Sequence, residues 1–285
     1  MQMDKLDGFR SGSYAGLAAD DLGQEDERPP LVLLHGLTLD RTMWRPALAE
    51  LESIDAGRRA VALDLPGHGE SPKAASYSVQ TIVERVHAAI LDAQLEDPVV
   101  VGHSGSAGTA SVYAATHRTR GVITVEGSSN VGAFAGMAQS LEPVLRGPGF
   151  DDAWARITAN VFGLDEVAPE VRAFVVATGR PNQEVVLGYW QELFERLPQQ
   201  LNAMVIEGAA AIRESGVRYV SVMGHDPSPE DVAWLRTNLP DARNLVWPDS
   251  GHFPHLAHPH RFADLLAETA TWTGGQLAGP SRSAG

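Results

Sequence analysis

The chain has 285 residues, of which 44% are hydrophobic and 20% are charged, a composition typical of soluble globular proteins. Its 22 basic and 36 acidic residues give a formal charge of −14, which opposes binding to nucleic-acid phosphates and to anionic membrane surfaces. The absence of cysteine excludes disulfides, thiolate metal ligands and a cysteine nucleophile. We therefore expect neither a nucleic-acid nor a membrane partner.

The N-terminal region carries little chemical signal. The first twenty residues lack the apolar core of a signal peptide, and no later apolar run is long enough to span a bilayer, so we expect a cytoplasmic protein. Residues 8–19 predict a weak first hairpin, and residues 24–30 predict a charged surface connection that ends in proline.

Apolar runs of strand length recur from residue 31 onward, as expected for strands that are buried on both faces of a parallel sheet. The first four runs are residues 31–34, 60–64, 98–102 and 122–125. Segments with helical periodicity separate them, over residues 44–51, 79–95 and about 105–117. This alternation of strands and helices predicts an α/β fold with a doubly wound, mostly parallel sheet and right-handed crossovers.

The alternation stops after residue 129. From about residue 130 to 215 the apolar residues follow helical spacing only, which predicts a helical cap inserted over the strand ends. Strands resume at residues 218–223 and about 244–247, with helices near 228–238 and 259–272. We therefore divide the chain into an α/β core of residues 1–129 and 216–273, a cap of residues 130–215 and a mobile tail of residues 274–285.

One turn carries the clearest chemical signal. The third apolar run ends in the sequence GHSGS of residues 102–106 and passes at once into a small-residue helix. This arrangement is typical of the nucleophile elbow, in which a strained turn lifts a serine Oγ above the sheet. The pattern G-x-S-x-G is matched around Ser104 except at its last position, where Ser106 replaces glycine with another small residue.

A catalytic serine needs a base to take its proton, and the base needs a carboxylate that fixes its tautomer and stabilises its positive charge. Ser104 ends one strand, Asp226 follows a later strand, and His252 follows the last one. Because the carboxyl ends of parallel strands meet at one sheet edge, we expect these three residues to converge there. Glu126, which ends the strand after the elbow helix, is an alternative acid for the same imidazole.

From about Leu31 to Trp272 the chain resembles the α/β-hydrolase superfamily. The segments that carry the resemblance occur in family order: LVLLHGL, DLPGHGESP, VVVGHSGSAG, VMGHDPSPED and DSGHFPHLAHP. The resemblance implies a serine mechanism without a cofactor, and an oxyanion hole formed by the backbone N–H groups of Leu37 and Gly105. It places the acid at Asp226. Zearalenone-type lactonases, in contrast, resemble this chain in having a glutamate at the position of Glu126 and a His-Phe-Pro segment at the base.

Two further residues are candidates for contact with the substrate. His103 flanks the nucleophile, where it could touch the substrate or serve packing alone. Trp190 is our first choice among the aromatic residues of the predicted cap for lining the pocket mouth, although such residues more often form core. Asp64 is expected to brace the DLPGHGESP loop.

A metal site is not expected. Histidines at positions 252, 255, 258 and 260 invite the hypothesis, because imidazole is a common metal ligand. The sequence contains no H-E-x-x-H helix, however, and the last two of these histidines border a proline. The superfamily that the chain resembles uses no metal.

These residues predict a capped serine hydrolase that cleaves a small-molecule ester or lactone through an acyl-enzyme intermediate, without a cofactor. A serine at the elbow argues against the dehalogenase and epoxide-hydrolase branches, which use a carboxylate nucleophile. Carbon–carbon bond hydrolysis, lyase chemistry and acyl transfer on the same triad stay open, as does a non-catalytic ligand-binding protein, because the fold does not fix the function. A homodimer is also left open.

Overall fold

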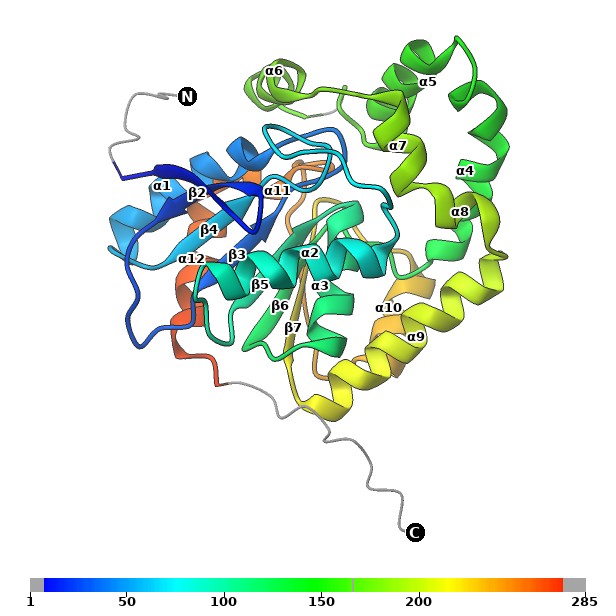
Figure 1. Ribbon diagram of the computed structural model, residues 1–285. Coiled ribbons are helices and arrows are strands. Elements are labelled where there is room, and N and C mark those ends of the chain that lie inside the picture. Colours follow the sequence, from blue (N-terminus) through cyan, green and yellow to red (C-terminus); the bar gives the residue numbers. More distant parts are fainter. Residues whose placement is uncertain (1–7, 166, 274–285) are drawn as a thin grey trace.

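The computed structural model describes residues 8–165 and 167–273, so the predicted tail of residues 274–285 lies outside the described residues. Its centre is an eight-stranded sheet in the order β1-β2-β4-β3-β5-β6-β7-β8, covered by helices on both faces (Figure 1). The strands are β1 (Arg10–Tyr14), β2 (Leu17–Leu22), β3 (Leu31–Leu34), β4 (Ala60–Leu63), β5 (Val99–His103), β6 (Gly121–Val125), β7 (Arg218–Met223) and β8 (Arg243–Val246).

Helices fill most of the remaining described chain. In chain order they are η1 (Arg41–Trp44), α1 (Arg45–Ile54), α2 (Val79–Asp92), α3 (Gly105–Thr116), α4 (Val131–Leu145), α5 (Phe150–Arg156), η2 (Ile157–Val161), α6 (Pro169–Thr178), α7 (Gln183–Tyr189), α8 (Gln191–Glu195), α9 (Pro198–Ser215), α10 (Pro229–Asn238), α11 (Pro254–Ala257), α12 (Pro259–Glu268) and η3 (Thr269–Thr271).

The sheet confirms the predicted fold class. Strands β4, β3, β5, β6, β7 and β8 pair in parallel, whereas β2 pairs antiparallel with β1 and β4. Every residue of β3, β4, β5 and β6 is buried, which explains why these strands appear in the sequence as continuous apolar runs. The carboxyl ends of β3, β5 and β6 lie side by side, so the loops that follow them meet at one edge.

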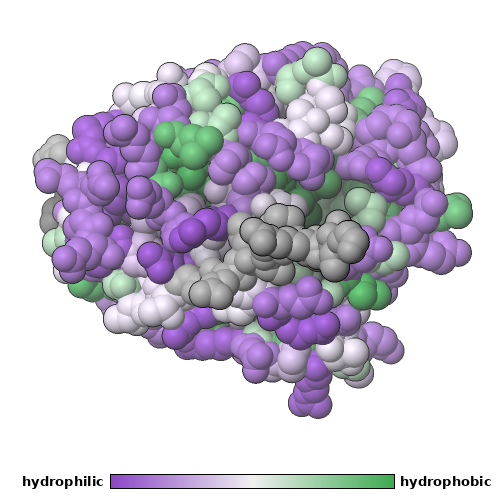
Figure 2. Space-filling view, turned by 60° about the horizontal axis from the view of Figure 1, so that its bottom comes forward, coloured by the Kyte–Doolittle hydropathy of each residue, from purple (hydrophilic) through white to green (hydrophobic). Residues whose placement is uncertain are grey.

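Two hydrophobic cores cover the two faces of the sheet. One joins the sheet to α1 and α12, and the other joins it to α2, α3 and α9. Figure 2 shows a largely hydrophilic outer face on which apolar residues form small separate groups. A groove of about 640 Å³ lies between α9, η3 and the first residues of β7 and β8, and its lining includes Arg218, Arg243 and Trp272. Because these strand starts lie opposite the carboxyl edge, the groove is separate from the candidate site.

The segment between β6 and β7 consists of helices α4 to α9, and its described residues contain no strand. We call this segment the helical insertion (residues 131–215). In Figure 1 it forms the green and yellow helices beside the sheet. Hydrogen bonds join it to loops at the carboxyl edge; among them, Arg180 N–H donates to Thr38 O at 2.7 Å, and Tyr189 O–H donates to Pro66 O at 3.0 Å. Aromatic residues of α4, α5, α7 and α8 form its own core.

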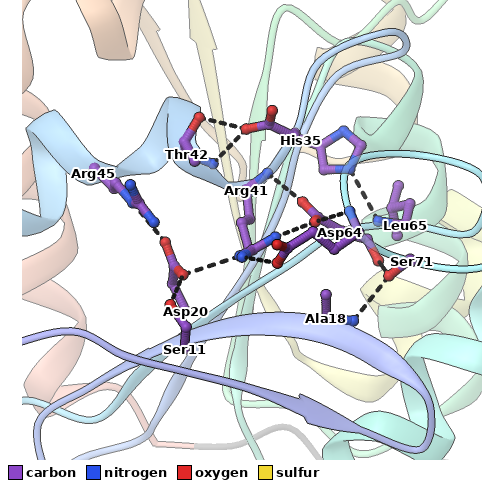
Figure 3. A network of polar contacts seen from close by, with 12 residues as sticks. Ser11, Ala18, Asp20, His35, Arg41, Thr42, Arg45, Asp64, Leu65 and Ser71 are labelled. Atoms are coloured by element: carbon purple, nitrogen blue, oxygen red, sulfur yellow. Dashed lines mark hydrogen bonds and ion pairs between the residues drawn. The ribbon is translucent and has the colours of Figure 1, made fainter. Parts of the chain in front are cut away.

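A buried ionic network holds the loops that follow β3 and β4 (Figure 3). The Arg41 guanidinium binds Asp20 at 3.0 Å, Glu70 at 2.5 Å and the carboxylate of Asp64. Asp64 also accepts the backbone N–H groups of Arg41 at 2.7 Å and of Glu70 at 2.9 Å. Asp64 therefore braces the loop of residues 65–72, as the sequence predicted.

Replacing Arg41 with methionine is expected to lower the free energy of unfolding by about 3 to 5 kcal/mol, because it leaves the buried carboxylates of Asp20 and Asp64 without their shared cation. Arg45→Met is the matched control, since Arg45 is more exposed and contacts Asp20 alone, and we expect a loss of about 1 kcal/mol. Urea denaturation at pH 7 measures both values. Equal losses in the two variants would contradict this account.

Candidate active site

Ser104 stands at the turn between β5 and α3 in a strained backbone conformation, with φ 55° and ψ −124°. Its N–H donates to Val125 O at 2.8 Å, and its carbonyl accepts Ala107 N–H at 2.9 Å. Glycine is required at Gly102, because a Cβ there would lie 2.1 Å from the carbonyl oxygen of Ser106. The close approach of strand and helix therefore fixes this turn in the geometry of a nucleophile elbow.

Ser106, the departure from the G-x-S-x-G pattern, has a contact of its own. Its side chain is buried, and its O–H donates to the carbonyl of His35 at 2.5 Å. This hydrogen bond joins the first turn of α3 to the loop after β3. Ser106 therefore connects two parts of the site. The sequence pattern indicated only that a small residue is needed at this position, and it did not predict this hydrogen bond.

His252 lies in the loop after β8, with its Nδ1 3.2 Å from Oε2 of Glu126. A carboxylate oxygen accepts hydrogen bonds, so this contact places the proton of the neutral imidazole on Nδ1. The opposite ring nitrogen, Nε2, is buried and has no hydrogen-bond partner among the described residues. The ring of Phe162, from the helical insertion, stacks on the imidazole with centroids 4.7 Å apart and planes inclined by 15°. The unpaired Nε2 is therefore the ring atom that can accept a proton.

Glu126 directly follows β6 and is buried in a left-handed backbone conformation with φ 55°. Its Oε1 accepts the N–H of Gly224 at 2.5 Å. Burial alone would raise the pKa of Glu126, but hydrogen bonds from His225, His252 and Gly224 outweigh burial and lower the pKa to about 2. Glu126 is therefore ionised at neutral pH, as a partner for an imidazolium should be.

Asp226, the other candidate acid, lies in the loop after β7. Its side chain is exposed and forms no hydrogen bond or ion pair within residues 8–165 and 167–273. The structure thus brings Glu126 to His252 and leaves Asp226 in solvent.

The loop after β3 passes directly beside the nucleophile turn. A Cβ added to Gly36 would lie 2.5 Å from His103 Nδ1 and 3.4 Å from Ser104 Cβ. Gly105 is the first residue of α3, so its N–H has no acceptor within the helix. Within the described part of the chain, neither this N–H nor that of Leu37 donates a hydrogen bond. The two N–H groups that the resemblance implies for an oxyanion hole are thus without an acceptor in the described structure.

Thr38 stabilises the same loop from both sides. It adopts a left-handed conformation with φ 67°. Its N–H donates to Nε2 of His68 at 3.1 Å, and its carbonyl accepts the N–H of Arg180. Burial lowers the pKa of His68 to about 3, so the ring is neutral and can accept this hydrogen bond.

His103 and Trp190, the predicted substrate contacts, are both buried. The Nε2 of His103 donates to the carbonyl of His252 at 2.7 Å, which joins the nucleophile turn to the loop of the base. Burial, together with the neighbouring His252, lowers the pKa of His103 to about 3, so this ring is neutral. Trp190 packs with Phe134 and Trp154 in the core of the helical insertion, and Leu37 packs against the same core.

Comparisons with known proteins identify the family of the chain. The sequence model of the alpha/beta hydrolase family matches residues 31–265, which include the nucleophile turn, both candidate acids and His252. The chain belongs to the alpha/beta hydrolase family. The predicted superfamily is thus confirmed, whereas the resemblance to lactonases finds no separate support.

Characterised relatives of this alpha/beta hydrolase differ in their reactions. The chain is 25% identical to a pimeloyl-[acyl-carrier protein] methyl ester esterase of Yersinia enterocolitica, over 84% of this chain and 92% of the relative. It is 29% identical to a 2-succinyl-6-hydroxy-2,4-cyclohexadiene-1-carboxylate synthase of Serratia proteamaculans, over 85% of this chain and 93% of the relative. The solved structure of a variant of AqdC, which cleaves the ring of the Pseudomonas quinolone signal, shares the fold at 15% identity. Its TM-score is 0.74, over 92% of this chain and 98% of the AqdC chain.

From the sequence, Phe162 was considered only as one of several aromatic residues of the predicted cap of this alpha/beta hydrolase, and His225 was not considered. Phe162 stacks on His252, and Nδ1 of His225 lies 3.5 Å from Oε2 of Glu126. The only sequence signal for His225 is its position at the end of β7, next to Asp226. Within the described chain, no group of three or more His, Asp or Glu side chains has the arrangement of a metal site, and no helix is long and apolar enough to cross a membrane.

Proposed function

We propose that this alpha/beta hydrolase is a serine hydrolase that cleaves a carboxylic ester or lactone through an acyl-enzyme intermediate. One observation carries the proposal: His252 binds the ionised Glu126 through Nδ1, while its Nε2 is buried and has no partner among the residues that the structure describes. The carbonyl of His252 binds His103, the residue next to the strained Ser104. A base oriented by a carboxylate, in a loop that is hydrogen-bonded to the residue beside a serine elbow, is the arrangement that nucleophilic catalysis requires.

In the first half of the reaction, Oγ of Ser104 attacks the substrate carbonyl and Nε2 of His252 takes the Oγ proton. The N–H groups of Leu37 and Gly105 bind the oxyanion, and each such donor typically lowers the barrier by about 2.7 to 4 kcal/mol. Glu126 stabilises the imidazolium. The imidazolium then returns the proton to the leaving alkoxide as the acyl-enzyme forms.

In the second half, His252 takes a proton from water as the hydroxyl attacks the acyl carbonyl, and Ser104 Oγ leaves with that proton. For a lactone, the alcohol and the acid released belong to one molecule. This scheme needs no cofactor, and each proton taken by His252 is returned within the same half-reaction.

We also propose that the helical insertion is a cap that encloses the acyl or alcohol side of the substrate. The support comes from its contacts: Leu37 of the loop after β3 packs on the insertion's aromatic core, and Phe162 covers His252. Trp190 belongs to that core and is proposed as part of the wall behind the substrate. An apolar small molecule suits such a lining.

Covalent labelling tests the proposed nucleophile directly. A fluorophosphonate probe should modify the folded protein at Ser104 alone, located by mass spectrometry of the labelled peptide, and prior heat denaturation should abolish the labelling. The same protein should hydrolyse p-nitrophenyl butyrate, and a series of lactones of increasing ring size then separates the two substrate classes. A folded protein that is neither labelled nor able to hydrolyse any of these substrates would refute the proposal.

A further inference from the structure

The carboxylate of Glu126 has a second imidazole partner that the proposed mechanism does not use. Nδ1 of His225 lies 3.5 Å from Oε2 of Glu126, the same oxygen that lies 3.2 Å from Nδ1 of His252. The residue before His225 is Gly224, whose N–H binds the other oxygen, Oε1. The turn directly after β7 therefore contacts both carboxylate oxygens, and one of these oxygens is shared between two histidines.

The two histidines differ in their contact with water. The side chain of His225 is 61% exposed, whereas that of His252 is 14% exposed. Water stabilises a charged ring, so the exposed imidazole accepts a proton more easily than the enclosed one. On acidification, we therefore expect His225 to become the first imidazolium beside Glu126.

The groups that face His225 are titratable, and most of them are acidic. They are Glu126 after β6, Asp226 from its own loop and Asp231 from α10, and His252 from the loop after β8 contacts the same oxygen of Glu126. The hydrogen bond to Glu126 raises the pKa of His225, and the charges of Glu126, Asp231 and Asp226 add to this effect against burial. Three carboxylates thus favour the cationic form of His225, while His252 shares Oε2 of Glu126 with it.

We propose that His225 is a positioning residue: by sharing Oε2 of Glu126, it keeps His252 unprotonated at acidities where a lone imidazole beside this carboxylate would be charged. One negative charge can neutralise only one imidazolium, and a second cation at the same oxygen is repelled. His252 must be neutral to take the Ser104 proton, so a cationic His225 extends activity towards lower pH. This inference rests on the proposed function.

The pH dependence of kcat/KM tests this role. In His225→Gln the amide can still donate to Glu126 but does not titrate. For hydrolysis of phenyl butyrate, with phenol measured by chromatography, we expect the acid limb to move up by about 0.5 to 1 pH unit. The activity of His225→Gln at pH 5, each enzyme being normalised to its own plateau near pH 8, should then be roughly three- to tenfold below that of the natural enzyme. His225→Lys, a permanent cation, should keep the natural acid limb or move it lower.

His260→Gln is the matched control. His260 is also an exposed histidine paired with a glutamate, with Nδ1 3.2 Å from Oε2 of Glu50, but it lies on α12 away from the site. Its pH profile should coincide with that of the natural enzyme. The inference is overturned if the acid limb of His225→Gln does not move, or if that of His260→Gln moves equally.

A spectroscopic titration separates this inference from the proposed function. In protein labelled with ¹⁵N-histidine, the titration midpoint of the His252 ring, followed by NMR, should be higher in His225→Gln than in the natural protein. The spectra also show directly whether the variant is folded. An unchanged midpoint overturns the role of His225 even where hydrolysis depends on Ser104, whereas a shifted midpoint without any hydrolysis supports the coupling and refutes the proposed function.

Discussion

Replacing Ser104 with alanine is expected to lower kcat/KM for p-nitrophenyl butyrate by about 10⁴-fold or more, because the substitution removes the atom that attacks the substrate carbonyl. The buried Nε2 of His252 then has no hydroxyl to deprotonate. The N–H groups of Leu37 and Gly105 would still bind the substrate carbonyl, so residual turnover should come from oxyanion stabilisation alone. Initial rates at pH 7.5, over a range of substrate concentrations, give this ratio.

Ser111→Ala is the control for this measurement. Ser111 lies two turns further along α3, and its O–H donates to the carbonyl of Ala107 at 2.9 Å. Its replacement leaves the nucleophile turn unchanged, so we expect rates within about threefold of the natural enzyme, as for most substitutions away from a site. If Ser104→Ala and Ser111→Ala retained similar activity, Ser104 would not be the nucleophile.

The second large effect concerns the acid. Glu126→Gln is expected to lower kcat by about 10³- to 10⁴-fold, by analogy with replacement of a triad aspartate by its amide. The amide lacks the negative charge that stabilises the imidazolium, and its NH₂ group can donate to Nδ1 of His252 and so favour the wrong tautomer. Asp226→Asn should change kcat by no more than about threefold, because this side chain is exposed and makes no contact with His252 among the described residues.

The two variants form a direct comparison, because each replaces a carboxylate with its amide at the end of neighbouring strands. Circular dichroism and thermal melting establish that both are folded before their rates are compared. A larger loss in Asp226→Asn than in Glu126→Gln would assign the acid to the loop after β7 and contradict the geometry described above.

Much of the fold could be predicted because its central strands are buried on both faces. Such strands appear in the sequence as continuous apolar runs. Where a helical segment connects two of these runs, the two strands are expected to lie parallel in the sheet. The family match confirms the inferred superfamily. The serine turn was also recognisable, since a strand, a turn with Gly102 and a small-residue helix are adjacent in the sequence. These are local patterns, and they need no knowledge of side-chain direction.

The choice of acid could not be made in this way. Glu126 and Asp226 follow neighbouring parallel strands, so the chain order places both near His252. The decision depends on the backbone at Glu126, which turns to φ 55° and directs its carboxylate towards Gly224 and His252. His225 was missed for a related reason. Its importance depends on a contact with one oxygen of a residue about a hundred positions earlier in the chain.

Three residues of the site that are not glycine, Thr38, Ser104 and Glu126, have positive φ angles. Each such conformation costs on the order of 1 to 3 kcal/mol, which the rest of the fold must offset. The energy is stored where the reaction is proposed to take place, so the most thermally resistant version of this chain is not its most active one. Selection for heat resistance alone would favour glycine or asparagine at these three positions, and at Ser104 and Glu126 it would thereby remove the proposed nucleophile and acid.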